Sequence, residues 1–136
     1  MRIGIDLGGT KIEAVAMDDG GDILYRQRTP TPRDNYAVIL RAIADLVERV
    51  ETTLGQAGSI GIGTPGAASA VDGRMKNCNT TCLNGQALQR DLEALMQRPL
   101  RLANDANCFA LSEAVDGAGQ NASSVFGVII GTGVGG

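Results

Sequence analysis

The chain has 136 residues, 43% of them hydrophobic and 20% charged, with a formal net charge of −3 and no histidine. This length suits one domain with a buried core, and without a basic run the chain is not expected to bind nucleic acid. The lack of histidine excludes the usual catalytic triads and most zinc sites, and no apolar stretch is long enough to span a membrane.

The first thirty residues predict three consecutive strands joined by turns. Strands are expected over residues 2–7, 11–17 and 22–29, with a turn at 18–21. In the first strand the apolar residues alternate with polar ones, which places Asp6 on the opposite face from its apolar neighbours. Pro30 and Pro32 are expected to end this part of the sheet.

The remaining residues predict helices that alternate with strands. A long amphipathic helix is expected from Tyr36 to Leu54, with Asp34 as its N-cap. After it we expect a buried strand with a glycine-proline turn over 59–66, a loop over 67–83, a helix over 84–97 capped by Asn84, a strand over 100–103, and a helix from Asn104–Asp105 to about Asp116, ended by Gly117. This order predicts an α/β domain with a mixed sheet.

Cysteine usage indicates the compartment. The chain has three cysteines, an odd number, and its N-terminus lacks the pattern of a secretory signal peptide. Reduced thiols are expected, and the sequence predicts a cytoplasmic protein. Cys78 and Cys82 have the spacing of half a metal site, but no second cysteine pair or histidine completes it.

Two glycine patterns match a dinucleotide-binding motif without its context. "GIGTPG" (61–66) and the final "GTGVGG" (131–136) both fit G-x-G-x-x-G. Such a site must open a helix within a βαβ unit. Pro65 interrupts the first match, and no helical pattern follows either one, so the dinucleotide interpretation is rejected.

Four motifs in chain order resemble those of the ROK family of bacterial sugar kinases. They are "GIDLGGTK" (4–11), "GIGTPG" (61–66), "LANDANC" (102–108) and "IIGTGVGG" (129–136). Within that family, "TPTPR" and "KNCNTTCLNG" most resemble fructokinase/mannokinase-type members. The resemblance implies an α/β ribonuclease-H-like fold, that of the actin/hexokinase ATPases, with a mixed sheet and helices on both faces. It also implies ATP-dependent phosphorylation of a hexose with Mg²⁺, first of all fructose, otherwise mannose or glucose.

The same resemblance implies a nucleotide site made of two glycine turns. It assigns phosphate binding to Asp6, Gly8, Gly9, Thr10, Lys11, Thr132 and Gly133. Glycines let backbone amides approach phosphate oxygens, and Asp6 would hold Mg²⁺ through water. The alternatives are that Asp6 is a turn residue at a strand end and that Lys11 is a solvated strand lysine.

On the sugar side the resemblance implies that Asp105 is the general base for the attacking hydroxyl. Asn104 would hold a neighbouring hydroxyl, and Pro65, Gly66 and Asn79 would contact the sugar. The alternative for Asn104 and Asp105 is an N-cap pair, which is compatible with the catalytic role. The dipole at a helix N-terminus keeps a carboxylate ionised, and phosphoryl transfer tolerates so weak a base because it depends mainly on positioning and electrostatics.

Family members are considerably longer than this chain. We therefore expect residues 1–118 to be an N-terminal sugar-kinase domain, and 119–136 to be a linker and the first strand of a missing C-terminal domain, without its hairpin partner. The missing domain would carry zinc and the adenosine pocket, so this half is expected to be inactive alone. The complete protein is expected to be a homodimer, and residues 125–131 are expected to pair between copies of the fragment.

Two non-catalytic hypotheses stay open. ROK-type sugar-responsive repressors share the fold but carry a DNA-binding segment ahead of the "DLGGT" strand, which here begins at residue 2. A sugar- or nucleotide-binding module is the other alternative. Cys82 stands where related sequences often have tryptophan, and it lies near the expected sugar loop.

Overall fold

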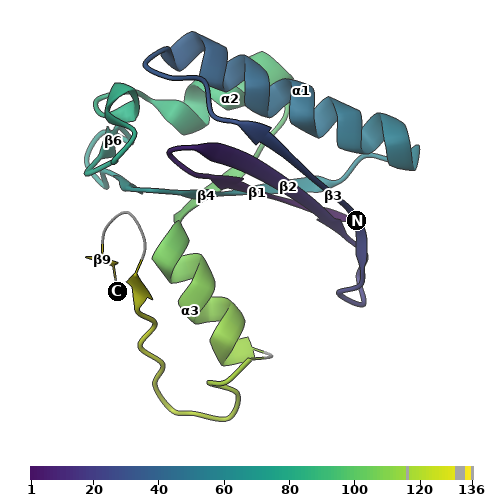
Figure 1. Ribbon diagram of the computed structural model, residues 1–136, viewed down its shortest axis with the longest axis vertical. Coiled ribbons are helices and arrows are strands. Elements are labelled where there is room, and N and C mark those ends of the chain that lie inside the picture. Colours follow the sequence, from purple (N-terminus) through teal and green to yellow (C-terminus); the bar gives the residue numbers. More distant parts are fainter. Residues whose placement is uncertain (116, 131–133, 136) are drawn as a thin grey trace.

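A five-stranded mixed sheet organises the chain (Figure 1). Its strands are β1 (Arg2–Leu7), β2 (Lys11–Met17), β3 (Ile23–Pro30), β4 (Ser59–Thr64) and β7 (Arg101–Asn104), in the spatial order β3-β2-β1-β4-β7. β1, β2 and β3 form an antiparallel meander, whereas β4 lies parallel to β1 and β7 parallel to β4. The computed structural model describes residues 1–115, 117–130 and 134–135. The predicted mixed sheet is confirmed.

Two helices cover one face of this sheet, and a third lies on the other side (Figure 1). They are α1 (Tyr36–Leu54) and α2 (Leu88–Met96) on the covered face and α3 (Asp105–Val115) on the opposite side. The predicted arrangement of helices on both faces is confirmed.

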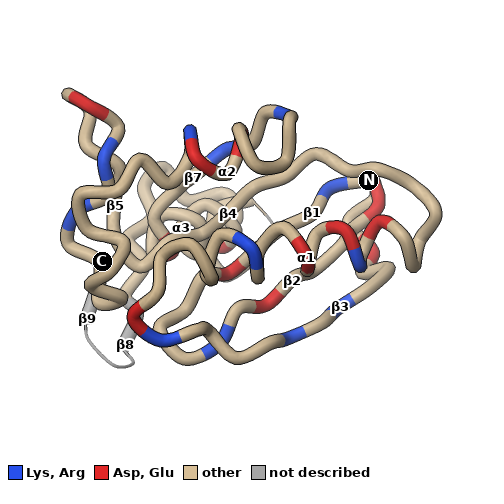
Figure 2. Tube along the Cα trace, turned by 90° about the horizontal axis from the view of Figure 1, so that it is seen from above, with Lys and Arg blue, Asp and Glu red and all other residues tan. Residues whose placement is uncertain are grey.

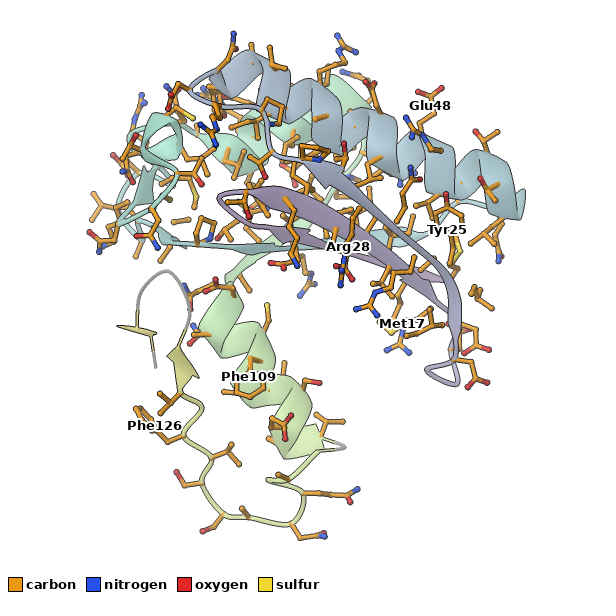
Figure 3. All side chains as sticks on the ribbon, viewed as in Figure 1. Met17, Tyr25, Arg28, Glu48, Phe109 and Phe126 are labelled. Atoms are coloured by element: carbon orange, nitrogen blue, oxygen red, sulfur yellow. The ribbon has the colours of Figure 1, made fainter. Side chains whose placement is uncertain are left out.

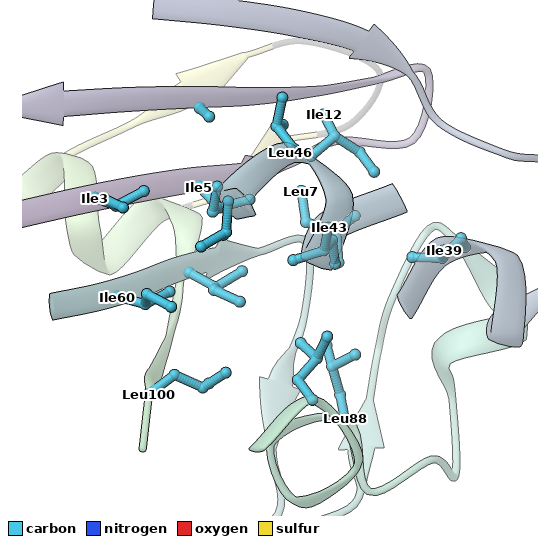
Figure 4. Close-up of a cluster of buried hydrophobic side chains, with 14 of the residues drawn as sticks. Ile3, Ile5, Leu7, Ile12, Ile39, Ile43, Leu46, Ile60, Leu88 and Leu100 are labelled. Atoms are coloured by element: carbon cyan, nitrogen blue, oxygen red, sulfur yellow. The ribbon is translucent and has the colours of Figure 1, made fainter. Parts of the chain in front are cut away.

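The hydrophobic core fills the space between the sheet and α1 and α2 (Figure 4). The alternating residues of β1 all point into it, since Ile3, Ile5 and Leu7 are at most 3% exposed. The sheet also contributes Ile12, Ala14, Ala16, Ile60 and Ile62, and the helices contribute Ile39, Ile43, Leu46, Val47, Val50, Leu88 and Leu92. Burial of one strand face fixes the register of β1, so Asp6 must lie on the face that α1 and α2 leave uncovered.

The starts of two helices differ from the sequence prediction. α1 is capped by Asn35, whose side-chain oxygen accepts a hydrogen bond from the Val38 amide at 3.1 Å. Asp34 has a φ of +51°, whereas an N-cap residue takes an extended conformation. α2 begins at Leu88, because the side chain of Asn84 is used elsewhere: it accepts from the Cys78 amide at 2.9 Å and donates to the Cys78 carbonyl at 3.1 Å.

The segment predicted as a loop over 67–83 contains short regular structure. β5 (Ala67–Ala68) pairs antiparallel with β6 (Met75–Lys76), and a 3₁₀ helix, η1, covers Thr81–Leu83. Two-residue strands and a single 3₁₀ turn are too short to produce a periodic hydrophobic pattern. The sequence therefore could not reveal this hairpin, which packs against the turn after β4 at Gly66.

The last described segment forms its own hairpin. β8 (Ile129–Ile130) pairs antiparallel with β9 (Val134–Gly135), and the assignment of 119–136 to a linker and the first strand of a further domain stays a prediction. Residues 125–128 run beside α3, where a Cβ added at Gly127 would lie 3.0 Å from the Phe109 ring (Figure 3). The predicted helix end at Asp116 lies outside the described residues, and the predicted pairing between copies through 125–131 stays a prediction.

Candidate functional site

The candidate site lies where three parallel strands end. Asp6 of β1 is in register with Gly63 of β4, and Gly63 with Ala103 of β7. The carboxyl ends of parallel strands meet at one edge of a sheet, where ligands of α/β proteins bind. The loops that follow these strands therefore converge at this edge.

Two aspartates lie close together at this edge. They are Asp6, which the sequence analysis assigned to the phosphates, and Asp105, which it assigned to the sugar. The Cα of Asp105 lies 3.9 Å from where a Cβ on Gly63 would stand, directly beside the strand that carries Asp6. Partial burial, followed by the negative charges of Asp105 and Glu13, raises the pKa of Asp6 above its ordinary value, while Lys11 lowers it. The sequence analysis assigned Asp6 and Asp105 to different substrates, and the fold places them next to each other.

The turn between β1 and β2, residues 8–11, is held from one side by Thr31. The Gly8 amide donates to the Lys11 carbonyl at 3.0 Å and so closes the turn. The Thr31 hydroxyl donates to the Gly8 carbonyl at 2.7 Å, and the Thr31 amide donates to the Thr10 carbonyl at 3.0 Å. Thr31 is only 6% exposed, so it supports the turn from within the protein.

The turn after β4 is fixed by a second buried threonine. The Thr64 hydroxyl lies 3.0 Å from the Gly66 carbonyl and 3.2 Å from the Ala103 carbonyl, and Thr64 is 1% exposed. Gly66 has no room for a side chain, because an added Cβ would lie 2.6 Å from Cys78 Sγ and would also overlap the Lys76 carbonyl. The glycine is therefore required for the β4 turn to pack against the β6 strand.

Asn104 links this turn to the start of α3. Its amide nitrogen donates to the Gly66 carbonyl at 3.3 Å, and its side-chain oxygen accepts from the Asn107 amide at 3.3 Å. The Asp105 carboxylate accepts from the Ala106 amide at 2.8 Å. The N-cap role for Asn104 is confirmed. Each of its polar atoms keeps a further donor or acceptor position for a ligand.

The loop that carries Asn79 lies against the 8–11 turn. Asn79 is exposed, and its neighbour Thr80 approaches Gly9, where an added Cβ would lie 3.6 Å from Thr80 Oγ1. That hydroxyl oxygen is buried and has no hydrogen-bond partner among the residues that the structure describes. Buried polar groups are normally hydrogen-bonded, so a hydroxyl without a partner beside a glycine turn calls for an explanation.

A charged cluster flanks the site on the same face of the sheet. The Glu13 carboxylate, in register with Asp6, accepts hydrogen bonds from the guanidinium groups of both Arg26 and Arg28. Figure 2 shows basic positions along β3, beside β2, and Figure 3 labels the Arg28 side chain. The bond from Arg28 is the main cause that holds the pKa of Glu13 below its ordinary value. Glu13 is thus held ionised by two guanidinium groups, whereas no hydrogen bond or ion pair to the Asp6 carboxylate occurs among the described residues, and only the charge of Lys11 lowers the Asp6 pKa.

The structure brings together most of the residues that the sequence analysis proposed. The strand ends, the loops and the helix start at this edge contain Asp6, Gly8, Gly9, Thr10, Lys11, Pro65, Gly66, Asn79, Asn104 and Asp105. Thr132 and Gly133 lie outside the described residues. The sequence analysis missed the supporting threonines Thr31, Thr64 and Thr80, for which only contacts between distant segments could have given a signal.

The rest of the described surface has no feature that suggests a binding site as strongly as this edge of the sheet. A hollow of about 220 Å³ lies between α1 and α2, on the opposite face of the sheet from Asp6, with a rim that includes Arg41, Asp45 and Arg98. Within the described ranges, no three His, Cys, Asp or Glu side chains gather as metal ligands. None of the helices described here has the length and apolar character needed to cross a bilayer.

Comparisons with known proteins agree with this geometry. The model of the ROK family matches residues 2–136. An N-acetyl-D-glucosamine kinase of Yersinia pestis bv. Antiqua (strain Nepal516) is 47% identical over 136 residues, which are 100% of this chain and 53% of that protein. This chain thus spans about half the length of the curated relatives it matches.

Two solved structures have the same fold. The ROK hexokinase from Thermus thermophilus superposes with a TM-score of 0.76 at 38% identity, covering 88% of this chain and 40% of that one. The ROK family glucokinase from Streptomyces griseus, solved with glucose and AMPPNP, gives a TM-score of 0.78 at 28% identity, covering 98% and 46%. The sheet and helices described above are those of the actin/hexokinase ATPase fold.

Proposed function

The chain belongs to the ROK family, and on that premise we propose that it is the half of an ATP-dependent sugar kinase that binds the sugar and one side of the nucleotide phosphates. The observation that carries the proposal is the meeting of Asp6 and Asp105 at one edge of the sheet, beside a glycine turn. A kinase must bring a phosphoryl group and a hydroxyl together. In this proposal Asp6 acts on the phosphates through Mg²⁺, and Asp105 acts on the hydroxyl.

In the proposed reaction Asp105 accepts the proton of the attacking sugar hydroxyl. The hydroxyl oxygen forms a bond to the γ-phosphorus of ATP, the bond from that phosphorus to the β-phosphate oxygen breaks, and ADP leaves. Amides of the 8–11 turn would hold phosphate oxygens. Asn104, fixed by its bonds to Gly66 and Asn107, would orient a neighbouring hydroxyl with its remaining donor and acceptor positions.

Asp6 fits the role of magnesium holder. Mg²⁺ is commonly bound through one or two carboxylates together with substrate phosphates. Asp6 is accessible to solvent, and its pKa is raised because neighbouring atoms shield part of the carboxylate from water and because negative charges lie nearby. A cation there would relieve that repulsion. When bound, Mg²⁺ would neutralise charge on the β- and γ-phosphates.

The proposed substrate is a hexose or an N-acetylhexosamine. The fructose preference expected from the sequence has no support in the names of the relatives, which include an N-acetyl-D-glucosamine kinase and a glucokinase. A panel of N-acetylglucosamine, glucose, mannose and fructose, assayed for ADP release, ranks the four directly. If fructose is not the best of the four substrates, the expected fructose preference is wrong.

The test of the function is Asp105→Asn in the whole gene product. Asparagine keeps an oxygen that can accept the Ala106 amide, so the start of α3 is preserved while the base is lost. We expect turnover of the best sugar to fall by about a hundredfold or more, with ATP affinity unchanged. Asp72→Asn, on the exposed 69–74 loop, is the control for the loss of one carboxylate.

If Asp105→Asn phosphorylates sugar at the wild-type rate, the catalytic assignment is wrong. If the wild-type protein binds sugar but releases no ADP with any of the four, the non-catalytic binding hypothesis replaces the kinase. The domain division at 118/119, the zinc of a further domain, the homodimer and the cytoplasmic location remain proposals for the whole protein.

A further inference from the structure

The hairpin turn at 8–11 lacks one of its expected hydrogen bonds. In an antiparallel hairpin the two residues that close the turn exchange two backbone bonds. Here the Gly8 amide donates to the Lys11 carbonyl at 3.0 Å, but among the described residues no bond returns from the Lys11 amide to the Gly8 carbonyl. That carbonyl accepts the Thr31 hydroxyl at 2.7 Å instead.

Thr31 therefore decides where the amides of the turn point. A peptide group is planar, and its carbonyl and amide point in opposite directions. Because the carbonyls of Gly8 and Thr10 both point at Thr31, the amides of Gly9 and Lys11 point away from it. No hydrogen bond from the amides of Gly9 and Thr10 occurs within the part of the chain that the structure describes.

Successive unpaired amides on an exposed turn form a concave site for an anion. Gly9, Thr10 and Lys11 are exposed, and Lys11 adds a positive charge close enough to lower the pKa of Asp6. Thr31 is 6% exposed, so its hydroxyl cannot reach a ligand and acts through the turn alone.

We propose that Thr31 is a positioning residue for nucleotide phosphate: its hydroxyl holds the Gly8 carbonyl and so keeps the Gly9 amide directed away from Thr31, toward a phosphate oxygen. The use of this anion site by ATP rests on the proposed kinase function. Without the hydroxyl, the Gly8–Gly9 peptide loses the bond that fixes its orientation, whereas the Thr10–Lys11 peptide stays held by the backbone amide of residue 31.

The kinetic test compares Thr31→Val with Thr31→Ser in the whole gene product. Valine has nearly the same shape but no hydroxyl, whereas serine keeps the hydroxyl. For Thr31→Val we expect KM and Kd for ATP to rise about tenfold, the effect of losing one hydrogen bond and the fixed orientation of the Gly9 amide, with KM for the sugar unchanged. Thr31→Ser should keep the wild-type values to within about twofold.

Thr53→Val is the matched control, because the Thr53 hydroxyl also donates to a backbone carbonyl, that of Arg49 at 2.8 Å, but at the exposed end of α1. It should leave the ATP constants unchanged. The proposal is overturned if Thr31→Val keeps the wild-type affinity for ATP, or if its KM for sugar rises as much as its KM for ATP, since a general loss of structure would raise both.

A second measurement does not depend on kinase activity. Inorganic pyrophosphate, followed by NMR, should shift the Gly9 amide signal in the wild type and not in Thr31→Val, because the Gly8–Gly9 peptide is no longer held. The Lys11 amide signal should shift in both proteins, because the backbone amide of residue 31 still holds the Thr10 carbonyl. If both hold in a protein without kinase activity, the proposed function fails and the positioning role stands; an equal shift of the Gly9 amide in the wild type and Thr31→Val overturns the positioning role itself.

Discussion

The β1–β2 turn and the β4 turn lie at the same edge of the sheet, and a buried threonine hydroxyl holds a glycine carbonyl in each. They differ in packing. Gly66 of the β4 turn is enclosed by Lys76 and Cys78, with no room for a Cβ. Gly9 of the β1–β2 turn is exposed, and its nearest neighbour would be in ordinary contact at 3.6 Å.

This difference indicates two uses of glycine within one site. On the proposed sugar side, glycine lets two backbone segments pack closely, so the shape of the turn is part of the fold. On the proposed phosphate side, glycine leaves amides accessible, and a contact from Thr31, just after β3, fixes the turn for the proposed ligand. Changes at Gly66 should therefore alter the free energy of unfolding, and changes at the 8–11 turn should alter ligand binding.

The largest expected effect separates the two glycines directly. Gly66→Ala should lower the free energy of unfolding by about 3 kcal/mol, because the added methyl group overlaps backbone and sulfur atoms. Gly9→Ala should change it by about 0.5 kcal/mol or less. Urea unfolding followed by circular dichroism measures both. Gly61→Ala is the control, since nothing lies within 4 Å of its added Cβ. Equal stability of Gly66→Ala and Gly61→Ala would contradict the packing argument.

The next effect concerns the second threonine. Thr64→Val should cost about 1–2 kcal/mol of stability, because the carbonyls of Gly66 and Ala103 lose a buried donor. In the whole protein it should raise KM for the sugar and leave KM for ATP unchanged, the reverse of Thr31→Val. Thr64→Ser, which keeps the hydroxyl, should behave as the wild type in both assays. If Thr64→Val raised KM for ATP and left KM for the sugar unchanged, our assignment of Thr64 to the sugar side of the site would be wrong.

The smallest expected effect is a gain in stability. The pKa of Asp6 is raised in the folded protein, so the ionised form destabilises the fold at pH values above that pKa, and the penalty disappears when acid protonates the group. Asp6→Asn should therefore be slightly more stable than the wild type near about pH 7 and equal to it near about pH 3. Urea unfolding at both pH values measures this.

Glu48→Gln, on the exposed face of α1 (Figure 3), controls for the loss of one negative charge and should show no such gain. If Asp6→Asn is less stable than the wild type near about pH 7, Asp6 has a structural partner that the described residues do not reveal, and its role as a cation holder is in doubt.

The amino-acid sequence determined the local and periodic features. Alternation in β1, the apolar stripe of α1 and the turn residues between strands are short-range signals, and they predicted the mixed α/β sheet with Asp6 at a strand end. The motifs identified the family. Both exceptions at helix starts, Asn35 and Leu88, come from competition among neighbouring polar residues for the same backbone groups.

Only the tertiary structure decided how these features form a site. Asp6 and Asp105 are 99 positions apart by their residue numbers, and they meet because β1, β4 and β7 are parallel and end together. The Thr31–Gly8 bond spans 23 residues, and the enclosure of Gly66 depends on a hairpin with two-residue strands. Such contacts leave no periodic trace, because each arises from the packing of separate segments rather than from the conformation of one.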